Sequence, residues 1–393
     1  MRSMAGSRLA WLLLLLACGG GANAPPEETP LPPFRGADIS ALERIEQAGG
    51  VFRDAGAPGD AIGILRARGS NLFRLRLFVN PSGAEVEVND LEYTVRMAQR
   101  VAASGAGVLL DLHYSDTWAD PGHQLTPAAW AGLGLDSLEA EVERYTAAAM
   151  ARLRQVGVVP EIVQVGNEVD DGMLWPLGRV STAPDTVVGW QQFTRLLKAG
   201  IRGVRAGLLP GDSVRILLHY SQGGSRGGTQ WFFDHIEAYG VPYDLIGLSY
   251  YPWWHGSLAG LQANLQAVAG RYGREIMVVE TAYPWRIGGW EGMAPNRAAM
   301  TWPTTRAGQA EFLKDVAQVV AATQGNRGIG VLWWYPEAIE VPGLFVWGGG
   351  SLALYDGGGN LLPAALAFEE GGSLPATTAL TQFRSVCSIS PSS

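Results

Sequence analysis

The sequence contains very little cysteine. Cys18 and Cys387 are the two cysteines in 393 residues, so a framework of several disulfides is excluded. If Cys18 is modified or removed, no internal disulfide can form, and the hydrophobic core must hold the fold together. With 47% hydrophobic residues, a chain of this length can bury a core of the required size.

Basic residues are also in short supply. Charged residues make up 17% of the chain, and 37 acidic residues against 29 basic ones give a formal net charge of −8. We therefore expect neither nucleic acid nor an anionic membrane surface as the main partner. The 14 tryptophans, in contrast, are many for this length. Some of them belong to the core, but exposed indole rings also bind the faces of sugars.

The apolar run at the N-terminus is too short to span a bilayer. Arg2 and Arg8 come before Leu12–Leu16, an arrangement typical of an export signal. The run continues through Ala17 to Cys18, and Leu15-Leu16-Ala17-Cys18 resembles the lipobox of bacterial lipoproteins. We expect acyl chains on Cys18 to tether the protein to a membrane. The alternative is ordinary cleavage a few residues later, which would give a secreted protein.

Composition divides the chain into four parts. Residues 1–18 are the expected signal segment, 19–33 a Gly/Pro-rich tether, 34–372 a folded domain and 373–393 a Ser/Thr-rich tail. The domain alternates short apolar runs with segments of helical periodicity, and we find no internal repeat. The predicted strands are Phe34–Ile39, Asn71–Val79, Gly107–His113, Glu161–Gly166, Val214–His219, Leu245–Tyr250, Ile276–Glu280 and Gly328–Trp334. The predicted helices include Leu91–Ala103, Leu138–Gln155, Gly189–Ala206 and Gln309–Ala322.

Eight strands alternating with helices predict an α/β fold, a single-domain (β/α)8 TIM barrel. The alternative is a doubly wound open sheet, but such a sheet usually has a glycine-rich phosphate loop after its first strand, and Gly36–Ser40 is not one. In a barrel the carboxyl ends of the strands form the active site. The polar and aromatic residues at those ends are Arg74, Arg76, His113, Asn167, Glu168, His219, Tyr250, Tyr251, Glu280, Trp333 and Trp334.

Two of these residues are carboxylates. Glu168 ends the fourth predicted strand and Glu280 ends the seventh. One glutamate at a strand end is usually a salt-bridge partner, but a facing pair, one protonated and one ionised, is the minimum for glycoside hydrolysis. Asp170 and Asp171 follow Glu168 and are expected to shape a turn. No Ser-His-Asp order or Cys/His metal spacing competes, so we expect no cofactor and no metal.

Several stretches resemble glycoside hydrolase family 53, the arabinogalactan endo-β-1,4-galactanases. They run in order from residue 34 to about 370. The stretch DLHYSDTWADP is long and unusual enough to be specific, whereas a bare Asn-Glu pair would not be. The matching segments are Arg35–Ser40, Arg74–Pro81, Asp111–Pro121, Val163–Glu168, Leu174–Gly178, Ile246–Pro252 and Val278–Thr281.

The resemblance implies a retaining double displacement. In it Glu168 is the general acid/base and Glu280 is the nucleophile, with the two carboxyl groups about 5–5.5 Å apart. Asn167 would hydrogen-bond the 2-hydroxyl of the sugar. Arg76 is expected to keep Glu280 ionised by charge pairing, although Arg74 shares its face of the strand and is the alternative partner.

The remaining site residues are expected to support or bind the substrate. His113, His219 and Tyr250 would orient the glutamates and bind hydroxyl groups, although each could also be an ordinary core residue. The aromatic and acidic residues are expected to line the sugar subsites, with Trp334 as the floor of the reacting subsite, Trp118 and Asp116 in a neighbouring one, and Trp175 further along.

The sequence departs from the family pattern at two places. The family commonly has Tyr-Trp-Glu-Pro on the eighth strand, whereas this chain has Trp333–Pro336 (WWYP), with Glu337 one position later. This puts the subsite preference in doubt. Bacterial members often carry a calcium-binding loop after the seventh strand, but residues 283–302 contain Glu291 as their single carboxylate. We therefore expect no calcium there.

The sequence thus favours an endo-acting β-1,4-galactanase that acts on pectic galactan outside the cytoplasm. The same machinery on mannan, xylan or cellulose is one alternative. A non-catalytic, surface-displayed sugar-binding protein is another, but Glu168, Glu280 and Asn167 are all present. We expect a monomer whose one contact with a membrane is the lipid anchor, and whose partner is the polysaccharide substrate.

Overall fold

The computed structural model describes residues 30–181 and 186–370. The predicted signal segment with Cys18, most of the tether and the Ser/Thr-rich tail lie outside these residues. No helix in the described part of the chain is long and apolar enough to cross a membrane.

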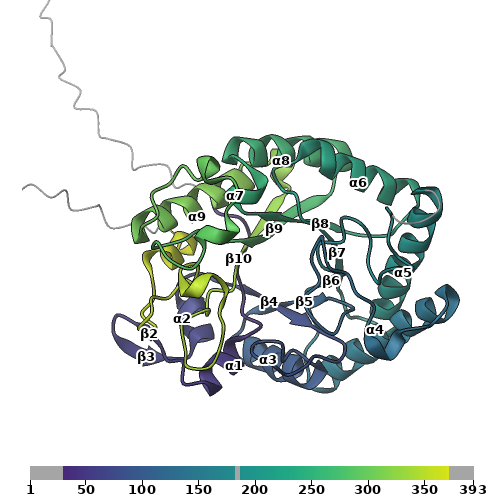
Figure 1. The fold of residues 1–393 in the computed structure, drawn as a ribbon, viewed down its shortest axis with the longest axis horizontal. Coiled ribbons are helices and arrows are strands. Elements are labelled where there is room, and N and C mark those ends of the chain that lie inside the picture. Colours follow the sequence, from purple (N-terminus) through teal and green to yellow (C-terminus); the bar gives the residue numbers. More distant parts are fainter. Residues whose placement is uncertain (1–29, 182–185, 371–393) are drawn as a thin grey trace, which may run out of the picture.

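Eight parallel strands close into a barrel at the centre of the molecule (Figure 1), in the order β1-β10-β9-β8-β7-β6-β5-β4. This confirms the predicted (β/α)8 fold, and each of the eight predicted strands has its counterpart. The strands are β1 (Phe34–Asp38), β4 (Leu72–Leu77), β5 (Gly107–Leu112), β6 (Ile162–Val165), β7 (Arg215–Tyr220), β8 (Leu245–Tyr250), β9 (Glu275–Thr281) and β10 (Gly328–Trp334). A separate two-stranded ribbon consists of β2 (Phe52–Asp54) and β3 (Ala57–Gly59).

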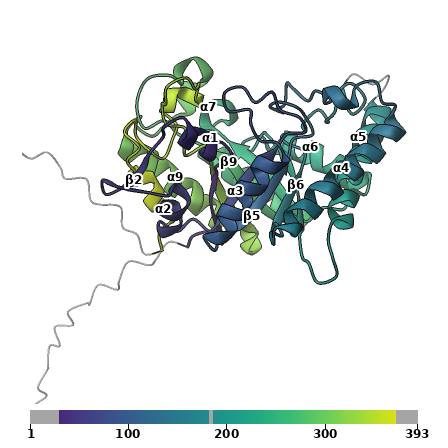
Figure 2. The ribbon, with the colours of Figure 1, turned by 90° about the horizontal axis from the view of Figure 1, so that it is seen from below.

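Helices form a ring around the barrel, as the end-on and side views show (Figures 1 and 2). They are α1 (Leu42–Gln47), α2 (Ala61–Ala67), α3 (Leu91–Ala103), α4 (Leu135–Gln155), α5 (Thr186–Ala206), α6 (Arg226–Ala238), α7 (Pro252–His255), α8 (Leu258–Tyr272) and α9 (Arg306–Ala321). Short 3₁₀ helices are η1 (Ala128–Trp130), η2 (Glu291–Met293), η3 (Arg297–Ala299), η4 (Gln324–Asn326), η5 (Trp347–Gly350) and η6 (Pro363–Phe368).

The predicted helices agree with the structure to within about one turn at their starts. Helix α3 has the predicted bounds, because Asp90 accepts a hydrogen bond from the Tyr93 amide at 2.8 Å and marks its N-terminus. Helices α4, α5 and α9 each begin three residues before the predicted start. Apolar periodicity misses these first turns because they carry few core-facing residues.

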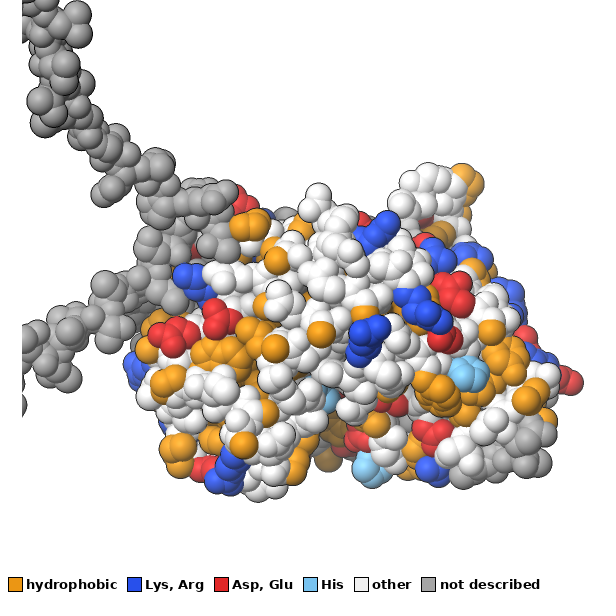
Figure 3. Space-filling view, turned by 90° about the horizontal axis from the view of Figure 1, so that it is seen from above, with side chains coloured by type: hydrophobic (Ala, Val, Ile, Leu, Met, Phe, Trp, Pro, Cys, Tyr) orange, Lys and Arg blue, Asp and Glu red, His pale blue; other side chains and the backbone are white. Residues whose placement is uncertain are grey.

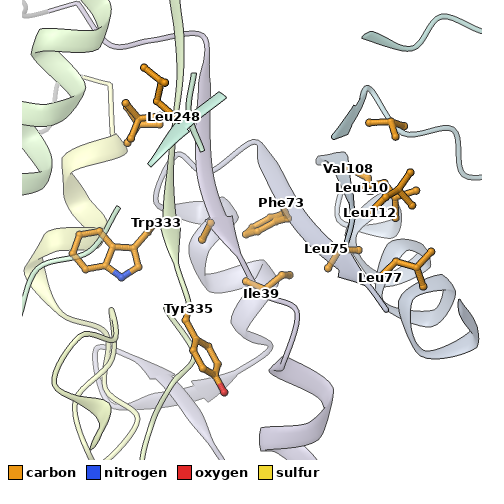
Figure 4. Close-up of a cluster of buried hydrophobic side chains, with 14 of the residues drawn as sticks. Ile39, Phe73, Leu75, Leu77, Val108, Leu110, Leu112, Leu248, Trp333 and Tyr335 are labelled. Carbon is orange, nitrogen blue, oxygen red and sulfur yellow. The ribbon is translucent and has the colours of Figure 1, made fainter. Parts of the chain in front are cut away.

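Because side chains alternate along each strand, one hydrophobic core lies between the barrel and the helices and a second lies inside the barrel. On β4, Phe73, Leu75 and Leu77 point towards the surrounding helices (Figure 4), whereas Leu72 and the two arginines point into the barrel. A layer of apolar side chains fills the amino-terminal half of the barrel interior, and polar side chains fill the other half. The inner apolar layer comprises Leu72, Leu109, Ile162, Leu217, Leu245, Met277, Val279, Ile329 and Leu332.

The outer surface has no single sign of charge on the face drawn in Figure 3. Basic and acidic side chains are interspersed there among neutral and hydrophobic ones. Elsewhere in the structure, charged side chains pair between neighbouring helices, such as Arg202 with Glu139 and Glu143. This distribution agrees with the low basic content of the sequence.

The close approach of β1 and β4 requires a glycine. A Cβ atom added to Gly36 would lie 1.8 Å from the Leu72 carbonyl oxygen. We predict that Gly36→Ala lowers the free energy of unfolding by at least about 2 kcal/mol. The new methyl group would clash with the backbone of Leu72, which cannot move aside as a flexible side chain can. Gly227 in α6 has open space around it, so Gly227→Ala is the matched control and changes stability by less than about 1 kcal/mol. Equal melting curves for the two variants in calorimetry would contradict the packing described.

Candidate active site

A cavity of about 830 Å³ lies at the carboxyl ends of the barrel strands. Each strand, or the residue or two that follow it, contributes a lining side chain, as expected if this end of the barrel carries the chemistry. The contributions in strand order are Asp38, Arg74, His113, Asn167 with Glu168, Ser221, Tyr251, Glu280 and Trp334.

Glu168 lies on a strained turn at the end of β6. Gly166 has φ of +83° and Glu168 itself has φ of +44°, a left-handed conformation that non-glycine residues rarely adopt. The turn is held by the Gly166 amide, which donates to the Leu112 carbonyl, and by the Val169 amide, which donates to the His219 carbonyl. A residue kept in this conformation by its surroundings is typical of functional sites.

Glu280 faces the cavity because β9 contains a bulge. Met277 and Val279 both point into the barrel, so simple alternation would place Glu280 outside. The pairing of β8 with β9 skips Val279, so Leu248 pairs with Val278 and Ser249 pairs with Glu280. The extra residue re-aims the following side chain, a common role of bulges next to active sites.

Arg74 connects the polar groups at the bottom of the cavity. Its guanidinium lies 2.9 Å from Asp38 Oδ2, 2.8 Å from Asp111 Oδ2 and 2.9 Å from Glu280 Oε1. It also donates to Asn167 Oδ1 at 2.7 Å. The side chain is 1% exposed, so these pairs lie in a low-dielectric interior.

The expected partnership of Arg76 with Glu280 is wrong, because Arg74 holds Glu280. Both arginines point into the barrel, but Arg76 lies one layer higher. Its Nε donates to Asn89 Oδ1 at 3.1 Å, and its guanidinium stacks 4.0 Å from the centre of the Trp118 ring. Arg76 thus lines the cavity and supports an aromatic wall.

The expected role of Tyr250 is also wrong, and the neighbouring Tyr251 takes its place. The Tyr251 hydroxyl donates to Glu280 Oε2 at 3.0 Å. Tyr250 points the other way, stacks on Phe312 of α9 and donates to the Gly256 carbonyl. Adjacent residues on a strand face opposite sides, and the sequence alone did not decide which tyrosine faced inwards.

The Asn167 amide has a fixed orientation. Arg74 can only donate hydrogen bonds, so the atom that faces its Nη2 must be the amide oxygen. Asn167 Nδ2 donates to the Ala119 carbonyl at 2.8 Å, which uses one of its two hydrogens. The second hydrogen is available to a ligand in the cavity that Asn167 lines.

Two predicted histidines lie beside these groups. His219 Nδ1 lies 2.9 Å from Asn167 Oδ1, and its Nε2 lies 2.9 Å from Ser249 Oγ. The Ser249 hydroxyl is in turn 2.6 Å from Glu168 Oε1. His113 lines the cavity, where its Nδ1 accepts from the Ala119 amide and its Nε2 donates to Asp111.

Tryptophan rings form one wall of the cavity. Trp118 and Trp334 meet edge to face with ring centres 6.0 Å apart, and Trp334 meets Trp347 at 4.4 Å. Trp254, also at the lining, is 44% exposed. Rings exposed in a polar cavity provide the flat apolar faces against which sugar rings pack.

Two residues predicted to line further subsites lie outside this cavity, where they hold loops. Among the described residues that line the cavity, neither Asp116 nor Trp175 occurs. Asp116 accepts from the backbone amides of Asn80 and Ala128, and so ties two loops together. Trp175 donates from its indole to the Asp171 carbonyl and stacks under Arg179.

The two glutamates have raised pKa values and unlike surroundings. Burial, and then the charge of Glu280, raise the pKa of Glu168 well above its ordinary value. Burial also raises the pKa of Glu280, to about 7, although Arg74 opposes this. Within the described part of the chain, the Glu168 carboxylate has a neutral hydrogen-bond donor, Ser249, whereas Glu280 has a cation. Glu168 is therefore the group that retains a proton more readily.

The acids that follow Glu168 shape the turn, as the sequence predicts. Asp170 accepts from the Ser221 amide and hydroxyl, and so fixes the loop after β7. Burial raises the pKa of Asp170 to about 7. Asp171 accepts from the Ser181 amide and pairs with Arg179.

The two segments that depart from the family pattern are held by other parts of the chain. In the loop after β9, Trp285 and Arg286 donate to carbonyl oxygens of Gly350 and Gly349. Glu337 is buried, and its Oε1 accepts from the Ala41 amide at 2.9 Å. Among the described residues, no group of three or more His, Cys, Asp or Glu side chains is placed to hold a metal ion.

Comparisons with known proteins agree with this architecture. The model of glycosyl hydrolase family 53 matches residues 34–368. The "Probable arabinogalactan endo-beta-1,4-galactanase A" of Aspergillus terreus is 37% identical over 319 residues, 79% of this chain and 87% of the relative. The arabinogalactan endo-beta-1,4-galactanase of Thermothelomyces thermophilus is 32% identical, over 78% of this chain and 90% of that protein.

Solved structures are similar over the same region. The Ignisphaera aggregans GH53 catalytic domain superposes with a TM-score of 0.78 and 30% identity, over 86% of this chain and 96% of that domain. A structure described as one of two fungal beta-1,4-galactanases gives a TM-score of 0.75 at 30% identity, over 86% and 99% of the two chains.

We predict that Arg74→Met lowers the free energy of unfolding by about 3–5 kcal/mol at neutral pH, because it leaves Asp38, Asp111 and Glu280 buried without their shared cation. The loss should shrink as the pH falls and Glu280, whose pKa burial raises to about 7, gains a proton. Arg96→Met is the control, since its pair with Glu43 lies at the surface. Urea titrations at several pH values measure both, and equal losses would contradict the central place of Arg74.

Proposed function

Because the chain belongs to glycosyl hydrolase family 53, we propose that it is an endo-acting glycosidase that hydrolyses β-1,4-galactan by a retaining double displacement. The side chains of pectic arabinogalactan type I are then its substrate. The observation that carries the mechanism is the pair of glutamates in one cavity, one bound by a cation and the other by a neutral hydroxyl.

In the first step Glu168 donates its proton to the glycosidic oxygen while Glu280 attacks the anomeric carbon. The bond to the leaving sugar breaks, and a galactosyl ester forms on Glu280. In the second step Glu168, now ionised, takes a proton from water, and the water oxygen displaces Glu280. Arg74 and Tyr251 stabilise the Glu280 carboxylate before attack and after release.

Binding residues act on the same sugar. The free hydrogen of Asn167 Nδ2 is directed to the 2-hydroxyl, a contact that strengthens in the transition state. Trp334 provides the apolar face under the reacting ring, and Trp118 extends this face along the groove. Retention requires the carboxyl groups of Glu168 and Glu280 to come within about 5–5.5 Å in the reacting complex.

The preference for galactan is supported by the relatives named as galactanases. The alternatives remain the same chemistry on mannan, xylan or cellulose, and a sugar-binding protein without catalysis. Product analysis on linear β-1,4-galactan, with mannan and carboxymethylcellulose in parallel, separates these functions. Activity on mannan but not on galactan would refute the substrate, and binding without cleavage would refute the enzyme.

We also propose that Cys18 carries the lipid that tethers the exported protein to a membrane. The support is the sequence Leu15-Leu16-Ala17-Cys18 after a short apolar run. Cys18→Ala should move the protein from the membrane fraction into the soluble exported fraction. An unchanged distribution after fractionation would exclude lipid attachment at this residue.

We predict that Glu168→Gln lowers kcat/KM on galactan by about 10²–10⁴-fold, the usual range for losing general acid catalysis. Glu280→Gln should lower it further, since the covalent intermediate cannot form. Asp116→Asn is the matched carboxylate control and should retain activity, because Asp116 lies outside the cavity lining. Initial rates from reducing-end release measure all three. Full activity in Glu280→Gln would refute the mechanism.

We predict a bell-shaped pH profile of kcat/KM for galactan. Glu280 must be ionised to attack, so activity falls as the pH drops through its pKa of about 7. Glu168 must be protonated to donate, so activity falls again as the pH rises through its pKa, which burial and the charge of Glu280 raise well above the ordinary value. The two apparent values belong to the coupled pair. An optimum near pH 4.5, where unperturbed carboxyls titrate, would contradict this assignment.

A further inference from the structure

Four side chains form a continuous line of hydrogen-bonding atoms that ends at Glu168. Asn167 Oδ1 lies 2.9 Å from His219 Nδ1, and His219 Nε2 lies 2.9 Å from Ser249 Oγ. Ser249 Oγ lies 2.6 Å from Glu168 Oε1. His219 and Ser249 are fully buried, so water does not substitute for a missing partner.

The protons along this line can be counted from the Asn167 end. Asn167 Oδ1 is an acceptor, because Arg74 donates to it. His219 Nδ1 faces that oxygen at 2.9 Å and also lies 3.2 Å from Gln164 Nε2. The two hydrogens of Gln164 Nε2 are directed to Asp111 Oδ1 and Asn167 Oδ1, so His219 Nδ1 carries the hydrogen of its own bond to Asn167. Burial, helped by the charge of Arg74, lowers the pKa of His219 well below its ordinary value, so the ring is neutral and Nε2 is an acceptor.

Ser249 cannot satisfy both of its neighbours by donation. A hydroxyl has one hydrogen, but His219 Nε2 requires a donor and so does an ionised Glu168. When Ser249 donates to His219, its oxygen can still accept, and the partner that donates to it is the protonated carboxyl of Glu168. In this arrangement every atom of the line is paired.

We propose that His219 and Ser249 are positioning residues that set the protonation of Glu168: His219, by accepting the hydrogen of Ser249, favours the protonated, proton-donating form, whereas Ser249 without that acceptor favours the ionised form. This inference rests on the proposed function and deepens it. Once Glu168 has given its proton to the leaving oxygen, the Ser249 hydroxyl rotates and donates to the new carboxylate, and His219 Nε2 loses its donor. When Glu168 takes a proton from water, the hydroxyl turns back. Ser249 keeps its own proton throughout.

Several charged or titratable groups act on this line from other elements. Within the described residues, none of these groups donates a hydrogen bond to His219 Nε2. They therefore change the electrostatic potential at Glu168 and His219, but Ser249 is still the donor that His219 Nε2 depends on. Around Glu168 they are Glu280, Asp170, Arg74 and Tyr251, and around His219 they are Arg74, His113 and His255.

Two pairs of variants test the proposal. The measurement is the alkaline limb of the pH profile, the pH range in which kcat/KM for galactan falls as the pH rises. His219→Asn keeps a donor near Asn167 but removes the acceptor at Nε2, so Ser249 is free to serve the ionised Glu168. The alkaline limb should move to lower pH by about 0.5–1 unit. His219→Gln places an amide oxygen where Nε2 lies and should keep the limb near that of the wild-type enzyme.

Ser249→Ala should move the same limb in the opposite direction. It removes the charge-assisted hydrogen bond to the ionised Glu168, which is stronger than the neutral bonds lost from the protonated form. We expect an upward displacement of about 0.5–1 unit, and Ser249→Thr, which keeps the hydroxyl, should reverse it. Structural damage alone lowers kcat without moving the limb in opposite directions. Displacements of both variants to the same side would overturn the proposal.

A second measurement does not depend on turnover. Nitrogen NMR of the five histidines, with His219 identified by its loss in His219→Asn, reports which ring nitrogen carries the hydrogen. The proposal requires hydrogen on Nδ1 and a hydrogen-bonded, unprotonated Nε2 while Glu168 is protonated. Hydrogen on Nε2 would overturn it. If the wild type fails to cleave galactan, the proposed function fails, and the NMR result still decides the inference.

Discussion

The ion cluster around Arg74 is the interaction on which the site depends. One buried guanidinium binds carboxylates from β1, β5 and β9 and the amide that follows β6, so four strands meet at one side chain. Separating any of the three carboxylates would leave a charge in a low-dielectric interior, which is costly. The cluster therefore fixes the positions of the groups around both glutamates before any substrate binds, and such preorganisation is what electrostatic catalysis requires.

The fold could be predicted because its signals are local. Apolar runs and helical periodicity identify the strands and helices, and Asp90 marks the start of α3. The position of Glu168 and Glu280 at strand ends was also enough to place both at the same end of the barrel, where the cavity lies. In a closed parallel barrel, the end of each strand points to the same face, so no long-range information is needed for this step.

What the sequence did not determine is which way certain side chains face. Tyr250 and Tyr251 are adjacent and chemically alike, and the choice between them depends on the phase of β8. The bulge at Val279 changes that phase on β9, and no residue in the segment signals it. Arg74 and Arg76 point to the same face of β4 and differ in how deep in the barrel they lie, which side-chain alternation does not reveal. The part that Ser249 plays could not be predicted, because a serine in an apolar strand carries no distinctive pattern.

Glu337 lies where the first and the last strand of the barrel meet. Its carboxylate accepts from the Ala41 amide, 296 residues earlier in the chain, beside the seam where β1 pairs with β10. Arg53 reaches the Gly358 carbonyl across a similar separation, 305 residues. Contacts between positions so distant in sequence form late, because the intervening chain must first be ordered. Strand β1 can pair with β10 only after β10 has been synthesised, so the barrel closes only when nearly the whole domain is present.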